Sequence, residues 1–150
     1  MRAAREWRLD QLLDMFPDVS RGTDRMLRCL LPIAGSGRFI QDKAGVHISA
    51  TVSLTATPAD RFRLRCSYPW PRTLRAAQRK VIQSELLRGI LEGTIMCEDP
   101  PWRCHLECTG VAWFPKEGVA WVQEAASLAV QDLVERGAWE AVGGPGDHVA

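Results

Sequence analysis

The sequence predicts an α+β domain, a two-layer sandwich in which a β-sheet packs against helices. Two observations predict this fold. Apolar and polar residues alternate from Val46 to Leu54, as in a strand with one buried face. Two later segments, 72–92 and 119–136, have helical composition. The expected order from residue 46 to 136 is therefore strand, strand, helix, strand, helix.

The length and composition favour one domain. A chain of 150 residues with 46% hydrophobic and 25% charged residues can bury one ordinary core. We expect an N-terminal helical extension and loop over 1–44, the main domain over 45–140 and a disordered tail over 141–150. No segment has the length and hydrophobicity of a membrane span or signal peptide, so a soluble, cytoplasmic protein is expected.

The N-terminal third predicts helix and loop. An amphipathic helix is expected over 5–16, where Leu9, Leu12, Leu13 and Phe16 form an apolar stripe that ends before Pro17. A second short helix is expected from Met26 to Leu31, with a strand as the alternative. The glycines at Gly35 and Gly37 and the polar run 41–45 predict a turn or flexible loop.

A second strand is expected directly after the first. Residues 57–60 read as a turn, and the apolar residues Phe62, Leu64 and Cys66 then alternate with Arg61, Arg63 and Arg65. We expect the two strands to pair as an antiparallel hairpin. The outer face of this hairpin would present three arginines.

The first long helix, over 72–92, is expected to be apolar in its later turns and basic in its first turns. Ile82, Leu86 and Ile90 lie on one face, and the basic residues Arg72, Arg75 and Arg79 continue that face upstream. Gly93 is placed as the C-terminal stop. The later turns should pack on the sheet, while the first two turns project past its edge.

The last strand and helix complete the predicted layers. Within the strand from Arg103 to Phe114, the residues Cys104, Leu106 and Cys108 share one face and His105, Glu107 and Thr109 the other. A final amphipathic helix is expected over 119–136, with Gly137 at its C-terminal end.

Several motifs occur in a particular order and spacing, namely Pro71, Ile82-Gln83 and Leu86, a Gly-x-Leu-x-Gly ending at Gly89–Gly93, and Ala125–Ala129 in the last helix. With these motifs, residues 45 to 140 resemble domain IV of translation elongation factor G. The resemblance implies the two-layer α+β fold and contact with the ribosome. The family's two tip loops differ here, at 67–70 and 113–118. The chain has no phosphate-binding loop of a GTPase, so we do not expect it to drive translocation.

The strongest functional signal is a basic tract. Seven basic residues and no acidic one lie between Arg61 and Lys80, in a chain of net charge +1. The candidate RNA-binding residues are Arg61, Arg63, Arg65, Arg72, Arg75, Arg79 and Lys80 for phosphates, and Tyr68 and Trp70 for unpaired bases. The alternatives are a solvated strand face whose arginines pair with acids of the last helix, and a contact with an acidic protein.

No metal, cofactor or catalytic site is expected. The cluster Cys97, Cys104, His105 and Cys108 invites a zinc interpretation, but its spacing is not that of a zinc motif, and strand parity sends His105 away from the cysteines. The odd number of five cysteines favours reduced thiols. Three histidines without a nucleophile motif leave an enzyme as a minor alternative.

The sequence therefore predicts a non-catalytic binding module that contacts structured RNA or the ribosome through a basic strand-helix surface. The alternative is a protein-interaction or homodimerisation domain that uses its tryptophans and N-terminal helix.

Overall fold

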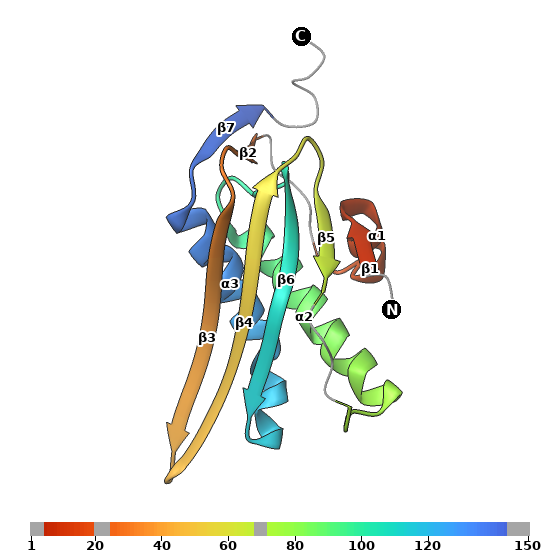
Figure 1. The fold of residues 1–150 in the computed structure, drawn as a ribbon, viewed down its shortest axis with the longest axis vertical. Helices are drawn as coiled ribbons and strands as arrows, with labels where there is room; N and C mark the ends of the chain where they lie inside the picture. The colour runs from red at the N-terminus through yellow and green to blue at the C-terminus, as the bar shows by residue number, and fades with distance from the viewer. Residues whose placement is uncertain (1–4, 20–24, 68–71, 144–150) are drawn as a thin grey trace.

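The computed structural model describes residues 5–19, 25–67 and 72–143. Its main sheet has five strands in the order β1-β5-β6-β4-β3. Their bounds are β1 (Arg5–Arg8), β3 (Ile33–Lys43), β4 (Val46–Pro58), β5 (Arg63–Cys66) and β6 (Cys104–Phe114). The strands β2 (Arg25–Cys29) and β7 (Trp139–Gly143) form a separate antiparallel pair. The helices are α1 (Leu9–Met15), α2 (Ala76–Met96) and α3 (Val122–Arg136), with the short 3-10 helix η1 (Lys116–Trp121) before α3 (Figure 1).

The strand β6 lies between β4 and β5, so the predicted hairpin of residues 46–66 is wrong. β4 pairs antiparallel with β6 on one side, and β5 pairs parallel with β6 on the other. Parallel neighbours need a long crossover connection, and α2 provides it. Both predicted strands exist, but they are neighbours of β6 and not of each other.

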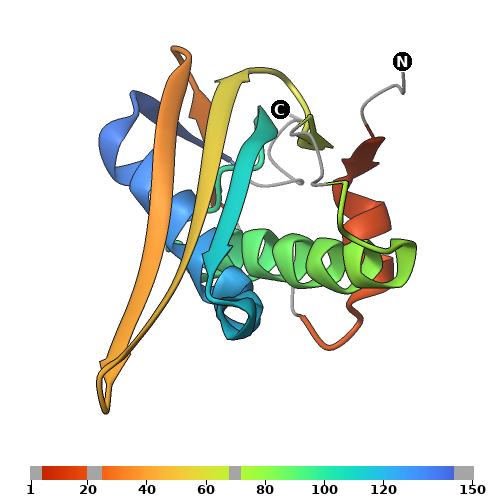
Figure 2. The ribbon, with the colours of Figure 1, turned by 60° about the horizontal axis from the view of Figure 1, so that its bottom comes forward.

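Helices α2 and α3 cover one face of the main sheet, and the core lies between the two layers (Figure 2). The inward side chains of the sheet include the fully buried Val52, Leu54 and Leu106, which join Leu86 and Ile90 of α2 in one hydrophobic cluster. The predicted alternation is confirmed by the burial pattern of β4 from Ala50 onward, whereas Val46, expected on the buried face, is exposed. The protein thus has the predicted α+β architecture.

Gly93 lies inside α2, which continues to Met96, so the predicted stop at Gly93 is wrong. Both Gly93 and Gly89 face α3. A methyl group at Gly93 would lie 2.9 Å from the Cα of Ser127, and one at Gly89 would overlap the carbonyl oxygen of Gln123. The missing side chains therefore permit close packing between the two helices.

Gly35 and Gly37 belong to β3, so the predicted loop at these glycines is wrong. All eleven residues of β3 pair with β4, and the connection between the strands is a tight turn at Ala44 and Gly45 with positive φ angles of 52° and 78°. A methyl group at Gly37 would overlap backbone atoms of α3. The glycines therefore mark the line along which α3 lies against the sheet.

The N-terminal segment is part of the fold rather than an extension. The predicted helix over 5–16 is correct only from Leu9, because residues 5–8 form β1 and pair with β5. The predicted helix from Met26 to Leu31 is wrong, since β2 covers 25–29, as the alternative proposed. Residues 141–143, expected in the tail, end β7, and residues 144–150 lie outside the described part.

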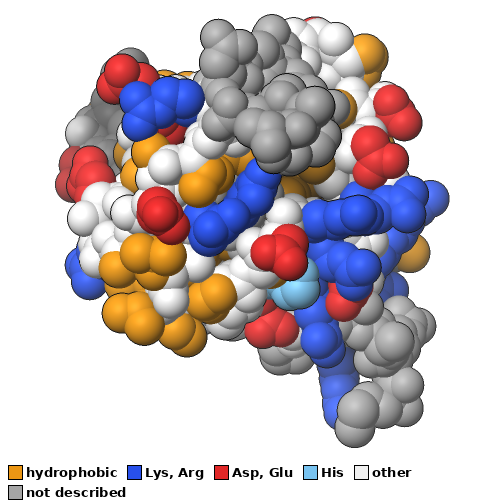
Figure 3. All heavy atoms as spheres, turned by 90° about the horizontal axis from the view of Figure 1, so that it is seen from above, with side chains coloured by type: hydrophobic (Ala, Val, Ile, Leu, Met, Phe, Trp, Pro, Cys, Tyr) orange, Lys and Arg blue, Asp and Glu red, His pale blue; other side chains and the backbone are white. Residues whose placement is uncertain are grey.

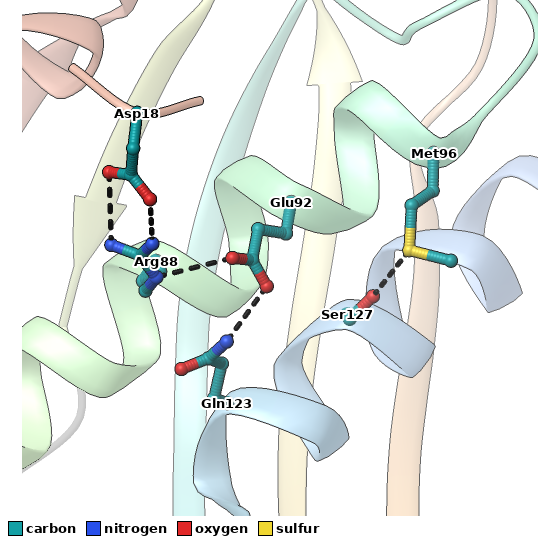
Figure 4. Close-up of polar contacts among 6 residues, drawn as sticks. All are labelled: Asp18, Arg88, Glu92, Met96, Gln123 and Ser127. Atoms are coloured by element: carbon teal, nitrogen blue, oxygen red, sulfur yellow. Dashed lines mark hydrogen bonds and ion pairs between the residues drawn. The ribbon is translucent and has the colours of Figure 1, made fainter. Parts of the chain in front are cut away.

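A polar network joins the segment after α1 to α2 and α3 (Figure 4). The guanidinium of Arg88 on α2 pairs with Asp18 and donates to Glu92 at 3.2 Å, and Glu92 accepts from Gln123 of α3 at 2.8 Å. The hydrogen bond from Arg88 holds the pKa of Asp18 below its usual value.

In the described segments, no helix combines the length and hydrophobicity needed to span a membrane.

Candidate nucleic-acid interface

The arginines of β5 point away from the helix layer. Leu64 between them is fully buried, while Arg63 and Arg65 are exposed on the opposite, outer face of the sheet. Arg63 lies opposite His105 of β6, and Arg65 lies opposite Glu107. The predicted alternation of this strand is therefore confirmed.

Glutamates of neighbouring strands partly neutralise these arginines. Arg63 pairs with Glu6 of β1 and Arg65 pairs with Glu107 of β6, each at 3.7 Å. The acids come from the sheet itself rather than from the last helix. The two arginine side chains remain 54% and 52% exposed, and such surface ion pairs contribute little to stability. A phosphate ligand would have to compete with these glutamates for the arginines.

An open groove of about 720 Å³ lies beside the start of β5. Four arginines line it, namely Arg8, Arg61, Arg63 and Arg103. The Nε of Arg103 donates to the sulfur of Met26 at 3.4 Å, and within the described residues neither Arg61 nor Arg103 has an acidic partner. Asp10 and Asp60 also line the groove. Figure 3 shows basic side chains gathered along one side of this end of the molecule, with acidic ones among them.

Sequence reasoning missed two of these arginines. The predicted helix over 5–16 includes Arg8, but this residue lies in β1 and its register partner is Arg63. Arg103 precedes β6, whose place beside β5 comes from the crossover through α2. Only the strand order brings the two residues to Arg61, so no local signal in the sequence identifies them.

The basic residues around the start of α2 form a second group of cations. Arg72, Arg75 and Lys80 are exposed, Arg79 is half-buried, and none of the four has an acidic partner in the described segments. The first turn of α2 contains no acidic residue. Because the N-terminus of a helix carries a partial positive charge, cations there are electrostatically unfavourable.

The seven predicted cations thus form two groups rather than one surface. The strand group (Arg61, Arg63, Arg65) lies at the β5 side of the sheet, with Arg63 and Arg65 on its outer face. The helix group (Arg72, Arg75, Arg79, Lys80) belongs to the layer on the other side (Figure 2). The predicted stacking residues Tyr68 and Trp70 lie outside the described residues.

The cysteines of β6 lie as strand parity predicted. Cys104 and Cys108 are buried, whereas His105 is exposed on the other face. Across 5–19, 25–67 and 72–143, no three His, Cys, Asp or Glu side chains come together as a metal site. Burial raises the pKa of the Cys104 thiol, and a hydrogen bond to Cys66 together with burial raises that of Cys108.

The described tryptophans serve packing. Trp7 and Trp102 are buried, and the other described ones are half-buried. Trp121 stacks on Phe39 with 4.5 Å between the ring centroids, and Trp139 donates to the carbonyl oxygen of Leu133 at 3.0 Å. Among the aromatic residues that the structure describes, Phe114 has an exposed ring, and it is 62% exposed.

Comparison with known proteins finds a similar fold in a solved structure. No protein-family model matches the chain, and neither does any curated protein. The crystal structure of ttk003000868 from Thermus thermophilus is similar, with a TM-score of 0.59 and 15% sequence identity. The match covers 81% of this chain and 18% of the Thermus chain. At this identity the likeness concerns the fold alone, and this chain spans less than a fifth of the length of the Thermus protein.

Proposed function

We propose that this chain is a non-catalytic module that binds structured RNA, on the ribosome or elsewhere, with the helix group as its main contact. The observation that carries the proposal is the set of four cations at the start of α2 that have no acidic partner among the described residues. The resemblance of residues 45–140 to domain IV of elongation factor G supports a ribosomal RNA as the ligand.

The placement of the helix group favours a ligand over a structural role. Cations near a helix N-terminus each cost about 0.3–1 kcal/mol, whereas acids there would be stabilising. Bound phosphates would offset this cost, because their negative charges would neutralise the cations. The counterions that the RNA releases would favour binding further. The strand group should contribute less, since Arg63 and Arg65 are already paired with Glu6 and Glu107.

The test is binding of the purified protein to a labelled RNA hairpin and to ribosomal subunits across a salt series. The variant R75Q/R79Q/K80Q should weaken binding at least about tenfold and reduce the salt slope by about 2 to 3, because each phosphate contact contributes about 0.9 to that slope. The control R25Q/K116Q/R136Q removes the same charge from three other elements. It should leave the affinity within about threefold of wild type.

Three outcomes would count against the proposal. Absence of binding at low salt would end it. Equal losses in the two triple variants would mean that only net charge attracts RNA. A dimer in solution without RNA binding would favour the alternative protein-interaction or homodimerisation domain. The variant R63Q/R65Q measures the strand group separately and should lose less affinity than the helix-group variant.

A further inference from the structure

The outer face of the main sheet is open. Both long helices lie on the other side, and in the described part of the chain no helix or strand covers the outer face (Figures 1 and 2). Its centre carries small polar side chains, namely Ser36, Thr51, Ser53, Thr55 and Thr109. One end carries Arg63 and Arg65 beside His105 and Glu107. The chemistry of the other end is different.

The far end of this face carries an exposed aromatic ring and an arginine. Phe114 of β6 and Ile40 of β3 flank Ser49 of β4 in one cross-strand row, and they are 62% and 44% exposed. Arg38 and Thr51 belong to the adjacent row of the same face. Arg38 is exposed and has no acidic partner within the described residues.

We propose that the open face binds an unpaired RNA segment, with a base stacked on Phe114 and a phosphate held by Arg38. The inference rests on the proposed function and adds the site for the single-stranded part of the ligand. Exposed aromatic rings can stack on the bases of a single strand, because every base has a π-face. Arg38 supplies a cation without competition from an acid.

The face suits a nucleic acid better than a protein partner. Protein interfaces bury an apolar core, whereas the large apolar side chains of this face, Phe114 and Ile40, lie together at one end. The serines and threonines between the two ends can accept or donate hydrogen bonds along a strand of RNA. The stretch of β6 from Glu107 to Phe114 spans about 23 Å at the rise of a strand, which gives room for several nucleotides.

The test compares a fluorescein-labelled 12-nucleotide oligouridine with an RNA duplex of equal length. Phe114→Ala should weaken oligouridine binding at least about fivefold, because stacking on an aromatic side chain contributes about 1–3 kcal/mol per base. It should leave duplex binding unchanged, since the helix group carries that. Phe114→Trp should retain binding, and Arg38→Gln should weaken it. Leu31→Ala is the matched control, because Leu31 is 63% exposed and precedes β3.

Cross-linking gives an independent readout. A 4-thiouridine oligomer irradiated on the protein should attach to the tryptic peptide Cys104–Lys116, which contains Phe114. Two results would overturn the inference: equal oligouridine affinity of the wild type and Phe114→Ala, or cross-links that fall only on α2. Duplex binding in the same experiment would leave the proposed function intact. Failure of the wild type to bind either RNA would remove the proposed function itself.

Discussion

The backbone N–H of Ser36 donates a hydrogen bond of 2.9 Å to the carboxylate of Asp132, which ties the edge strand β3 to helix α3. Among the described residues, β3 has β4 as its only neighbour in the main sheet, so the other edge of β3 faces away from the sheet. Asp132 also accepts from Arg136 at 2.9 Å. Exposed strand edges are templates for pairing with other chains, and this contact occupies one donor of that edge.

Replacing Asp132 should loosen the edge. Asp132→Ala should lower the free energy of unfolding by about 1 kcal/mol, because a hydrogen bond to a charged group is lost. It should also raise self-association at high concentration, since the freed edge can pair. Urea unfolding and sedimentation measure the two effects. Glu124→Ala, an exposed position on the same helix, is the control, and equal behaviour of both variants would refute the role of the contact.

The same contact predicts a dependence on pH. The Ser36 hydrogen bond and then the nearby Arg136 hold the pKa of Asp132 below its ordinary value, although burial opposes them. A carboxyl group with a lowered folded pKa stabilises the protein above its unfolded pKa, and this contribution is lost as pH falls through the folded value. The stability difference between wild type and Asp132→Asn should therefore be constant above about pH 5 and shrink below about pH 4. A stability difference that did not begin to shrink as the pH falls below about 4 would contradict this assignment.

Two glycines of the sheet should respond differently to the same substitution. Gly37→Ala should destabilise the protein by about 3 kcal/mol or more, because its methyl group would overlap backbone of α3. Gly110→Ala should change stability by less than about 1 kcal/mol, because the new methyl group would lie 3.7 Å from Ser53. Thermal unfolding of the pair measures the contrast. Similar melting temperatures would mean that α3 does not pack on β3 as described.

The helix group should affect stability and binding in opposite directions. Arg79→Gln and Lys80→Gln should together raise the free energy of unfolding by about 0.5 kcal/mol, because two cations leave the positive end of α2. The same variant should weaken RNA binding. Chemical unfolding at low salt gives the first quantity, and the increase should diminish at high salt. A loss of stability would show that these side chains have a structural role instead.

The cysteines should separate by reactivity in the folded protein. Cys29, Cys104 and Cys108 are buried, and burial contributes to the raised pKa of each of these thiols, so they should react slowly with iodoacetamide. Cys66 and Cys97 are half-buried and should react before the three buried thiols. Peptide mass spectrometry at about pH 8 after short labelling distinguishes them. Uniform labelling of all five thiols in folded protein would be inconsistent with this core.

Local sequence patterns predict the strands and helices that have one buried face. The alternation of β4 and of β6 and the apolar stripe of α3 each follow from one buried face. The helix predicted from Met26 to Leu31 is wrong because the segment pairs with β7, which is more than a hundred residues away along the chain. Propensity within a short window does not contain this information.

Glycines mislead the sequence prediction for a physical reason. Gly37 and Gly93 have the usual meaning of turn or stop signals when each is considered in isolation. In the fold, α3 packs directly on another element at each of these glycines.

The candidate site is likewise only partly predictable from local sequence. Alternation locates Arg63 and Arg65, whereas the paired acids and the arginines Arg8 and Arg103 depend on which strands become neighbours.

The position of β6 has a consequence for synthesis of the chain. When the ribosome has made residues up to 103, the growing polypeptide can hold two strand pairs, β1 with β5 and β3 with β4, and each pair lacks its inner neighbour. The local sequence between Val46 and Cys66 favours a direct hairpin of β4 and β5 at that stage. β6 is the last strand of the main sheet to be made, and it must then insert between β4 and β5. The nascent chain therefore contains a competitor to its own native strand pairing.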